Sequence, residues 1–313
     1  MSSTPLDLEG LPAVGPAAVC MGVFDGVHRG HAALLAATAA AARERGVAAV
    51  ALVFDPPPIE VIRPGTEVPR LAPLDENLRR IAESGIDHAI PMQFTPAIRD
   101  LRPEMFLAAL APAIEVRTLV LTPDSAFGRG RSGTPEAMRV HGADAGFEVL
   151  VLERLEGDAE GAISSSRIRS LVVAGEVKAA ASLLGRPPYL AGTVVHGDAR
   201  GRELGYPTAN LAFGYHPARP ANGIYAGRAG VPAASVGPGH AALVSIGVRP
   251  TFEESSRVLV EVHLLDYEGD LYNAELRLEV HHRLREERRF ASVDALVDQM
   301  RADERGARSL LGS

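Results

Sequence analysis

Two histidines stand three residues apart near the start of the chain, at the end of a glycine-rich run. His28 and His31 close the segment Gly22-Val-Phe-Asp-Gly-Val-His-Arg-Gly-His31. Residues spaced i and i+3 share one side of a helix, so both imidazoles can face the same ligand. Gly22 permits a tight turn and Gly30 lets a phosphate approach the backbone where a helix begins. The pattern predicts imidazoles that donate hydrogen bonds to a phosphate while negative charge builds on it.

A metal site is the other chemistry that two close histidines permit. The chain has a single cysteine, Cys20, and no glutamate stands between His28 and His31 as it does in zinc-protease helices. Zinc normally takes four nitrogen, sulfur or carboxylate ligands, or three and a water. The sequence therefore favours phosphate chemistry over metal binding at this segment.

Past the middle of the chain, oxygen-bearing side chains follow a second glycine-rich stretch. The segment from Gly201 to Asn210 reads Gly-Arg-Glu-Leu-Gly-Tyr-Pro-Thr-Ala-Asn, which brings Thr208 and Asn210 close behind a proline. Each of these residues taken alone is typical of an ordinary turn. Magnesium prefers oxygen ligands and leaves room for phosphate oxygens and water. Together the residues favour a magnesium ion held against nucleotide phosphates.

Glu261 lies in a run whose polarity alternates. Val260 and Val262 flank it, so in a strand its carboxylate lies on the opposite face from these apolar residues. A glutamate on a strand is usually just exposed to solvent. Beside a phosphate site, however, its carboxylate can accept the proton of an alcohol that is being phosphorylated. Glu261 is therefore our candidate general base.

Composition narrows the class of partner. The chain has 313 residues, enough for two domains with separate cores, and a net charge of −7. That charge argues against a broad nucleic-acid surface and favours small phosphorylated ligands. The start lacks the basic region of a signal peptide, the apolar runs are too short to span a bilayer, and Cys20 has apolar neighbours. We expect a cytoplasmic protein with no membrane segment and no obligatory protein partner.

The N-terminal half alternates apolar runs with helical patterns. Runs that are apolar on both faces and separated by helices predict a doubly wound parallel sheet, as in Rossmann-like nucleotide-binding domains. The expected strands are 17–23, 47–54, 88–94, 116–121 and 147–152, and the expected helices are 31–45, 75–84, 103–114 and 135–145.

After residue 164 the pattern changes to two short helices, 166–173 and 176–184, and then to an apolar period of two. Alternation of that kind predicts an antiparallel barrel or sandwich. Ser292 can cap a last helix running to about Asp303, with an apolar stripe that closes the barrel. The stripe is Val293, Leu296, Val297 and Met300. We place the domain boundary between residues 186 and 187.

The motifs carry a resemblance to a known family. The first segment fits the nucleotidyltransferase pattern His-x-Gly-His, and its fuller form resembles the bacterial bifunctional riboflavin kinase/FMN adenylyltransferase (FAD synthetase) family. The run from Ile163 to Arg169, Ile-Ser-Ser-Ser-Arg-Ile-Arg, is similar to that family's second nucleotide motif, and the stretch from Gly192 to Leu211 resembles the riboflavin kinase signature. The resemblance covers nearly the whole chain. It implies phosphorylation of riboflavin by the C-terminal domain and transfer of AMP from ATP to FMN by the N-terminal domain, with Mg2+ as cofactor.

The same resemblance implies roles for individual residues. His28 and His31 would be catalytic in adenylyl transfer, Glu261 would be the general base of the kinase, and Thr208 and Asn210 would bind magnesium. The residues implied in nucleotide binding are Gly22, Phe24, Gly30, Ser164, Ser165, Arg167, Arg169, Gly201, Arg202 and Gly205. Those implied in flavin binding are Asp124, Phe127 and Arg285.

One segment departs from the family pattern. The family has Gly-Glu-Asp-Phe or Gly-Glu-Asn-Phe before its Phe-Gly pair, whereas this chain has Thr122-Pro-Asp-Ser-Ala126 there. The acid is kept at Asp124 and an aromatic residue is lost. Two alternatives therefore stand beside the bifunctional enzyme: an active kinase with an impaired or altered adenylyltransferase domain, and a non-catalytic flavin-binding regulator.

Overall fold

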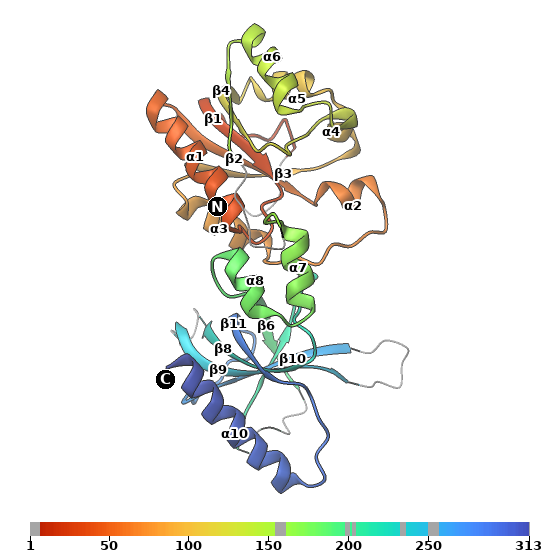
Figure 1. Ribbon diagram of the computed structural model, residues 1–313, viewed down its shortest axis with the longest axis vertical. Coiled ribbons are helices and arrows are strands. Elements are labelled where there is room, and N and C mark those ends of the chain that lie inside the picture. Colours follow the sequence, from red (N-terminus) through yellow and green to blue (C-terminus); the bar gives the residue numbers. More distant parts are fainter. Residues whose placement is uncertain are drawn as a thin grey trace. The chain divides into compact units, whose positions relative to one another are not determined.

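Two units with separate sheets make up the chain (Figure 1). The computed structural model describes residues 7–153, 161–197, 201, 205–231, 236–249 and 257–312. One unit, here called the sheet unit, comprises Met1–Val68 and Leu74–Ser164. The other, the barrel unit, comprises Pro69–Pro73 and Ser165–Ser313.

The sheet unit contains five strands in the order β3-β2-β1-β4-β5, and all of their pairings are parallel. This arrangement confirms the predicted doubly wound sheet. Because the strand order reverses between β1 and β4, a crevice is expected at the carboxyl ends of these two strands. The strands are β1 (Gly15–Gly22), β2 (Ala48–Asp55), β3 (His88–Gln93), β4 (Ile114–Leu121) and β5 (Glu148–Val151).

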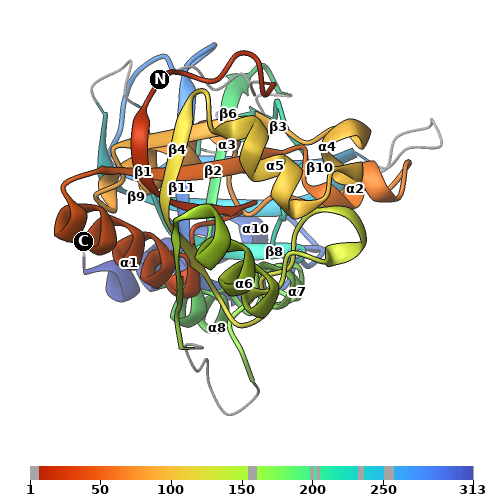
Figure 2. The same ribbon diagram turned by 90° about the horizontal axis from the view of Figure 1, so that it is seen from above.

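Helices cover both faces of this sheet (Figure 2). Leu34 and Leu35 of α1 and Ile81 of α3 pack against one face, and Phe106 and Leu110 of α5 pack against the other. Short helices at residues 58–62 and 96–100 were not predicted, because one turn of helix leaves little periodic signal. The helices are α1 (Arg29–Arg45), α2 (Pro58–Ile62), α3 (Leu74–Glu83), α4 (Pro96–Asp100), α5 (Pro103–Leu110) and α6 (Pro135–Ala145), with the 3-10 turn η1 (Arg129–Arg131) before α6.

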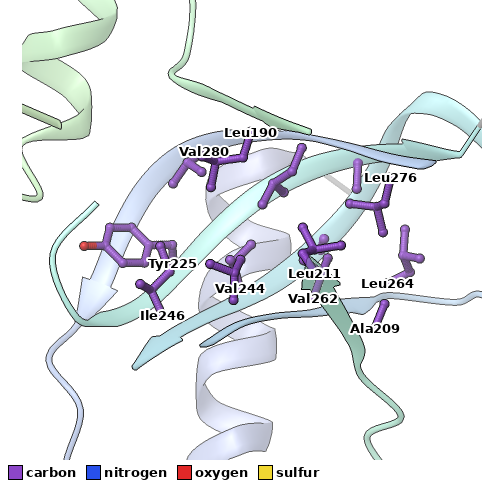
Figure 3. Packing of buried hydrophobic residues seen from close by; sticks show 14 of the residues in the cluster. Leu190, Ala209, Leu211, Tyr225, Val244, Ile246, Val262, Leu264, Leu276 and Val280 are labelled. Carbon is purple, nitrogen blue, oxygen red and sulfur yellow. The ribbon is translucent and has the colours of Figure 1, made fainter. Parts of the chain in front are cut away.

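The barrel unit is a closed barrel with the strand order β10-β7-β6-β11-β8-β9, so the barrel rather than the sandwich is correct. Its pairings are antiparallel. Apolar side chains from every strand fill the interior, as Figure 3 shows for Leu190, Val244, Val262 and Leu276. The strands are β6 (Tyr189–Val195), β7 (Ala209–Ala212), β8 (Gly223–Val231), β9 (Val236–Arg249), β10 (Arg257–Leu264) and β11 (Glu275–Arg285).

Two short helices, α7 (Ser165–Val173) and α8 (Val177–Leu184), group with the barrel. So does the short stretch Pro69–Pro73, where the Arg70 N–H donates to the His216 carbonyl over 2.7 Å. The functional boundary at residues 186 and 187 stays a prediction. No helix in the described part of the chain is both long and apolar enough to cross a membrane.

The last helix, α10 (Val293–Leu311), is longer than predicted. Ser292 caps it as expected, accepting the Ala295 N–H, but the expected end near Asp303 is wrong. Its buried apolar residues are Ala307 and Leu311, which pack on the outside of the barrel against Ala226, Ala241, Leu243 and Leu265, whereas Val293 is 61% exposed. The strands close the barrel by themselves, and α10 covers part of its outer surface.

Candidate active sites

The histidine turn lies between β1 and α1, at the carboxyl edge of the parallel sheet. Phe24, Gly26 and Val27 all have positive φ angles, of 52°, 74° and 39°, which fold the backbone into a compact loop. The Gly26 N–H donates to Oδ1 of Asn77 on α3 over 3.0 Å, so this strained loop is anchored to a neighbouring helix. The Phe24 side chain is fully buried, so any contact it makes with a nucleotide comes from its backbone.

His28 and His31 stack on each other at the start of α1. Their ring centroids lie 3.6 Å apart with planes inclined by 14°. The backbone N–H of His31 donates to Nδ1 of His28 over 3.2 Å, so His28 caps the helix. An imidazole nitrogen that accepts a hydrogen bond carries no proton, and a neutral His28 therefore has its proton on Nε2. Nε2 is then the ring nitrogen of His28 that can donate a hydrogen bond.

The glycines of this turn sit where a side chain would not fit easily. A Cβ at Gly30 would lie 3.2 Å from Cε1 of His28, and one at Gly22 would lie 3.3 Å from the Phe24 ring. A side chain at position 30 would therefore press against the ring of His28. The backbone N–H groups at the start of a helix attract phosphate.

Beside this turn the sheet unit holds a cavity of about 290 Å³. Met21, Gly22 and Val23 form the wall that leads into the histidine turn. The remaining wall is mostly aromatic and aliphatic, and Arg99 and Arg131 add positive charge. Pockets that are largely apolar with a few polar groups typically bind small organic ligands.

Four phenylalanines form the aromatic part of this wall. Phe54 and Phe94 meet with centroids 5.4 Å apart, and Phe106 and Phe127 meet at 6.1 Å. Phe106 lies on α5, whereas Phe54, Phe94 and Phe127 stand at or after the carboxyl ends of β2, β3 and β4, the edge at which parallel sheets bind ligands. A flat apolar ring can pack against such a wall.

The two residues predicted to bind flavin in this unit differ in position. Phe127 lines the cavity, whereas Asp124 is exposed and does not occur among the described residues of its wall. Ser125, in the segment that departs from the family pattern, lines the cavity and accepts the Thr122 N–H through Oγ over 2.9 Å. The altered segment is therefore an ordered turn at the cavity's edge.

In the barrel unit, strand register brings the predicted metal ligand and base together. Asn210 on β7 is the direct cross-strand partner of Glu261 on β10, which is in turn the partner of Ser245 on β9. Directly opposed residues in an antiparallel pair lie on the same face, with Cβ atoms about 5 Å apart. Val260 and Val262 point into the core, so the half-buried Glu261 and Asn210 lie on the outer face of the barrel. This confirms the expected orientation of Glu261.

Gly197 lies against Asn210 of β7, and Gly201 lies against the residues just before that strand. A Cβ at Gly197 would lie 2.2 Å from Nδ2 of Asn210, and one at Gly201 would lie 3.5 Å from Oγ1 of Thr208. The Tyr206 N–H also donates to the Gly201 carbonyl over 2.8 Å. A side chain at position 197 would therefore collide with Asn210, whereas position 201 is at ordinary contact distance from Thr208. Gly205 has a φ of 82°, which suits glycine, and Arg202 lies outside the described residues.

Thr208 also lines a small cavity of about 70 Å³ at one end of the barrel. The segment that follows β10, including Tyr267 and Tyr272, forms the opposite side. The Tyr272 ring stacks on His196 with centroids 3.8 Å apart. No group of three or more His, Cys, Asp or Glu side chains that could hold a metal ion occurs among the described residues. The oxygen atoms of Thr208 and Asn210 are nevertheless the donor type that Mg2+ takes, with phosphate and water completing its shell.

Arg285 makes a specific ion pair. Its guanidinium binds Asp303 of α10 through Nε at 3.0 Å and Nη2 at 2.7 Å, and Gln299 donates to the same carboxylate over 2.7 Å. The two charged side chains are only 18% and 7% exposed. Arg285 therefore ties α10 to the end of β11, and its predicted contact with flavin stays a prediction.

The run from Ser164 to Arg169 spans the division between the units. Ser164 belongs to the sheet unit, and Ser165, Arg167 and Arg169 lie on α7 in the barrel unit. Their predicted role in binding the departing phosphates stays a prediction.

Comparison with known proteins shows which family this chain belongs to. The riboflavin kinase family model matches residues 184–311, and the FAD synthetase family model matches residues 12–167. A bifunctional riboflavin kinase/FMN adenylyltransferase of Pseudomonas fluorescens is 37% identical over 291 residues, which cover 93% of this chain and 91% of that relative. This chain belongs to the bifunctional riboflavin kinase/FMN adenylyltransferase family.

A second curated relative and a solved structure match over similar lengths. The bifunctional enzyme of Escherichia coli strain K12 is 35% identical over 298 residues, 93% of this chain and 92% of its own. A crystal structure of a macrolide-efflux protein from Streptococcus pneumoniae has a TM-score of 0.89 and 30% identity, covering 97% of this chain and 98% of that one. The family's two kinds of domain correspond to the parallel sheet and the closed barrel described above.

Several site residues were not found from the sequence. Phe127 of the larger cavity was predicted as a flavin-binding residue, but the other three phenylalanines of its wall were missed. Phe54 and Phe94 stand at the ends of predicted strands, which was a usable signal. Asn77 gave no signal, because its contact with Gly26 depends on how α3 packs. His263 and Tyr206, whose contacts are described below, were missed for the same reason.

Proposed function

We propose that the two reactions of this enzyme are divided between its units. As a bifunctional riboflavin kinase and FMN adenylyltransferase, it phosphorylates riboflavin with ATP and transfers AMP from ATP to FMN. We assign the first reaction to the barrel unit and the second to the sheet unit. FMN is then the product of one site and the substrate of the other.

For the kinase, Glu261 accepts the proton of the primary hydroxyl of riboflavin as that oxygen attacks the γ-phosphate of ATP. Thr208 and Asn210 would hold the magnesium ion that accompanies ATP, which when bound would neutralise charge on the phosphates. The register that places Asn210 opposite Glu261 brings base and metal ligand to one spot, which supports this assignment. We assign Gly197, Gly201, Arg202 and Gly205 to the segment of the sequence that binds the phosphates.

For the adenylyltransferase, the phosphate of FMN attacks the α-phosphate of ATP and pyrophosphate leaves. His28 donates through Nε2–H, and His31 beside it supports the same charge. The larger cavity, whose wall runs into the histidine turn, takes the flavin ring against its phenylalanines. Gly22 and Gly30 allow the phosphates of ATP to approach the start of α1 in this proposal.

The placement of Glu261 opposite Asn210 carries the proposal, and Glu261→Gln tests it. Glutamine has the same shape but cannot accept the proton. We expect riboflavin phosphorylation to fall by about 10²–10⁴, while FAD formation from supplied FMN continues. The measurement is separation of riboflavin, FMN and FAD after incubation with ATP and magnesium. Equal loss of both activities would contradict the division between units.

The same assay on the unaltered protein separates the alternatives. FAD from riboflavin supports both reactions, FMN alone indicates a kinase with an altered adenylyltransferase, and unchanged riboflavin indicates a non-catalytic flavin-binding protein. A cytoplasmic location fits the single cysteine, which is buried and free.

A further inference from the structure

His263 stands two residues after Glu261 on β10 and therefore on the same face of the strand. Its Nδ1 lies 2.7 Å from the carbonyl oxygen of Pro207. A carbonyl oxygen can only accept a hydrogen bond, so Nδ1 of His263 carries the proton and donates it. This contact joins β10 to the residue directly before Thr208.

The contact occurs where the backbone pairing of β7 and β10 stops. The register pairs Glu261 with Asn210 and Val262 with Ala209, and the next pair in the same register would be His263 with Thr208. Strand β7 begins at Ala209, and Pro207 has no N–H with which to extend the ladder. The His263 side chain thus supplies a link between the strands just beyond the last backbone pair.

Tyr206 holds the same turn from another direction. Its ring meets that of His263 with centroids 5.2 Å apart, and its hydroxyl donates to Oε2 of Glu304 on α10 over 3.3 Å. Tyr206 is only 8% exposed, and its burial together with the Glu304 carboxylate raises the pKa of its hydroxyl. Arg308 in turn binds Glu304 and Asp266, the latter over 2.7 Å. Tyr206, directly before Pro207, is therefore linked to the C-terminal helix α10.

We propose that His263 is a positioning residue of the kinase site: through Nδ1–H it holds the Pro207 carbonyl, so that Thr208 and Asn210 stay in place beside Glu261. The proposal rests on the function assigned above, in which Thr208 and Asn210 hold the magnesium of ATP. A group that orients metal ligands without touching the metal typically contributes 10- to 100-fold in affinity or activity.

Three substitutions in the full-length protein separate the donor from the bulk of the ring. His263→Leu keeps the apolar volume and removes the donor. His263→Asn places an amide N–H near the position of Nδ1, whereas His263→Gln places one near Nε2. We expect kcat/KM for magnesium ATP in riboflavin phosphorylation to fall about 10- to 100-fold in the leucine and glutamine variants, and the asparagine variant to recover most of it.

A second measurement does not depend on turnover. Hydrogen–deuterium exchange of peptides covering residues 206–212 reports whether the turn is held in place. We expect faster exchange in His263→Leu and restoration in His263→Asn, with peptides from β8 unchanged. His281→Leu is the matched control, because His281 is a partly exposed histidine of the same barrel whose ring contacts Glu279 on its own strand at 3.4 Å. It should leave exchange and kinetics as in the unaltered protein.

Failure of this inference about His263 can be told apart from failure of the proposed function. Unchanged exchange at residues 206–212 in His263→Leu overturns the inference, as does an asparagine variant that is as impaired as the leucine variant. A uniform loss of FMN adenylylation alongside kinase activity would indicate general unfolding and also overturn it. If instead Thr208→Ala and Glu261→Gln both keep full kinase activity, the assigned kinase residues are wrong, while the exchange data still decide whether His263 holds the turn.

Discussion

In the sheet unit, the two histidines and the glycines beside them come from one continuous turn between β1 and α1. In the barrel unit, Asn210, Glu261 and Ser245 come from three different strands and meet only through register. The first site is shaped by local backbone, including three residues of positive φ, and the second by the sheet around it. A change in one residue of the turn should therefore act locally, whereas the barrel site should respond to contacts between strands.

His28→Asn is the strongest test of the local site. An asparagine oxygen can accept the His31 N–H that Nδ1 of His28 now accepts, so α1 stays capped. The second ring nitrogen is lost, and with it the predicted donor to the α-phosphate. We expect FAD formation from FMN to fall by about 10²–10³, measured by flavin separation, with riboflavin phosphorylation unchanged. Retention of full adenylyltransferase activity would remove His28 from the mechanism.

Gly197→Ala tests the site in the barrel unit through a residue that lies outside the strands carrying Asn210 and Glu261. The added Cβ would lie 2.2 Å from Nδ2 of Asn210, so the amide must move away from its place opposite Glu261. We expect kcat/KM for magnesium ATP in the kinase reaction to fall roughly tenfold, and adenylylation to continue. Gly214→Ala is the matched control, because a Cβ there meets nothing within 4 Å. If both variants behave alike, the contact with Asn210 has no role in the reaction.

Phe127→Leu should have a smaller effect, and only in the sheet unit. Leucine keeps an apolar side chain in the larger cavity but removes the ring that meets Phe106. Aromatic pairs are worth about 0.5–1.5 kcal/mol beyond their buried area, so we expect the KM for FMN to rise severalfold. The KM for ATP in the same reaction serves as the internal control. A larger change for ATP than for FMN would place the nucleotide, not the flavin, in this cavity.

The difference between a site built from one turn and a site built by strand register also explains what the sequence could predict. The strand, turn and helix around His28 are specified by neighbouring residues: an apolar run, glycines at tight positions and an alanine-rich helix stopped by Gly46 in a left-handed conformation. The sequence also predicted that Glu261 lies on the opposite face from Val260 and Val262. It could not predict that Glu261 faces Asn210, because register between strands distant in sequence depends on the closed barrel.

Helix α10 and the larger cavity are two further features that the sequence predicted only in part. Helical periodicity identified an amphipathic helix, but it could not show that Ala307 and Leu311, beyond the predicted end, make the buried contacts. The cavity draws its wall from the ends of four strands and from three helices, so it has no continuous motif. Family resemblance assigned Arg285 to flavin, while the structure adds its ion pair with Asp303, which no sequence pattern revealed.

Cys20 provides a test of whether the two units unfold independently, and the change expected here is the smallest. It is the single cysteine, it is fully buried in β1, and burial raises the pKa of its thiol to about 12. Because the thiolate is the reactive form, an alkylating reagent near neutral pH reacts only when the sheet unit opens. The alkylation rate, followed by mass spectrometry, therefore reports the stability of that unit.

We expect Gly197→Ala and His263→Leu in the barrel to change this rate by less than about twofold, as for distant substitutions that share no contacts. Asn77→Ala is the positive control, since it removes the Oδ1 atom that accepts the buried Gly26 N–H. Loss of such a hydrogen bond costs about 1–3 kcal/mol, so alkylation of Cys20 should accelerate fivefold or more. If the barrel substitutions accelerate it equally, the two units unfold together, and the contrast between a locally built site and a site built by register does not extend to their stability.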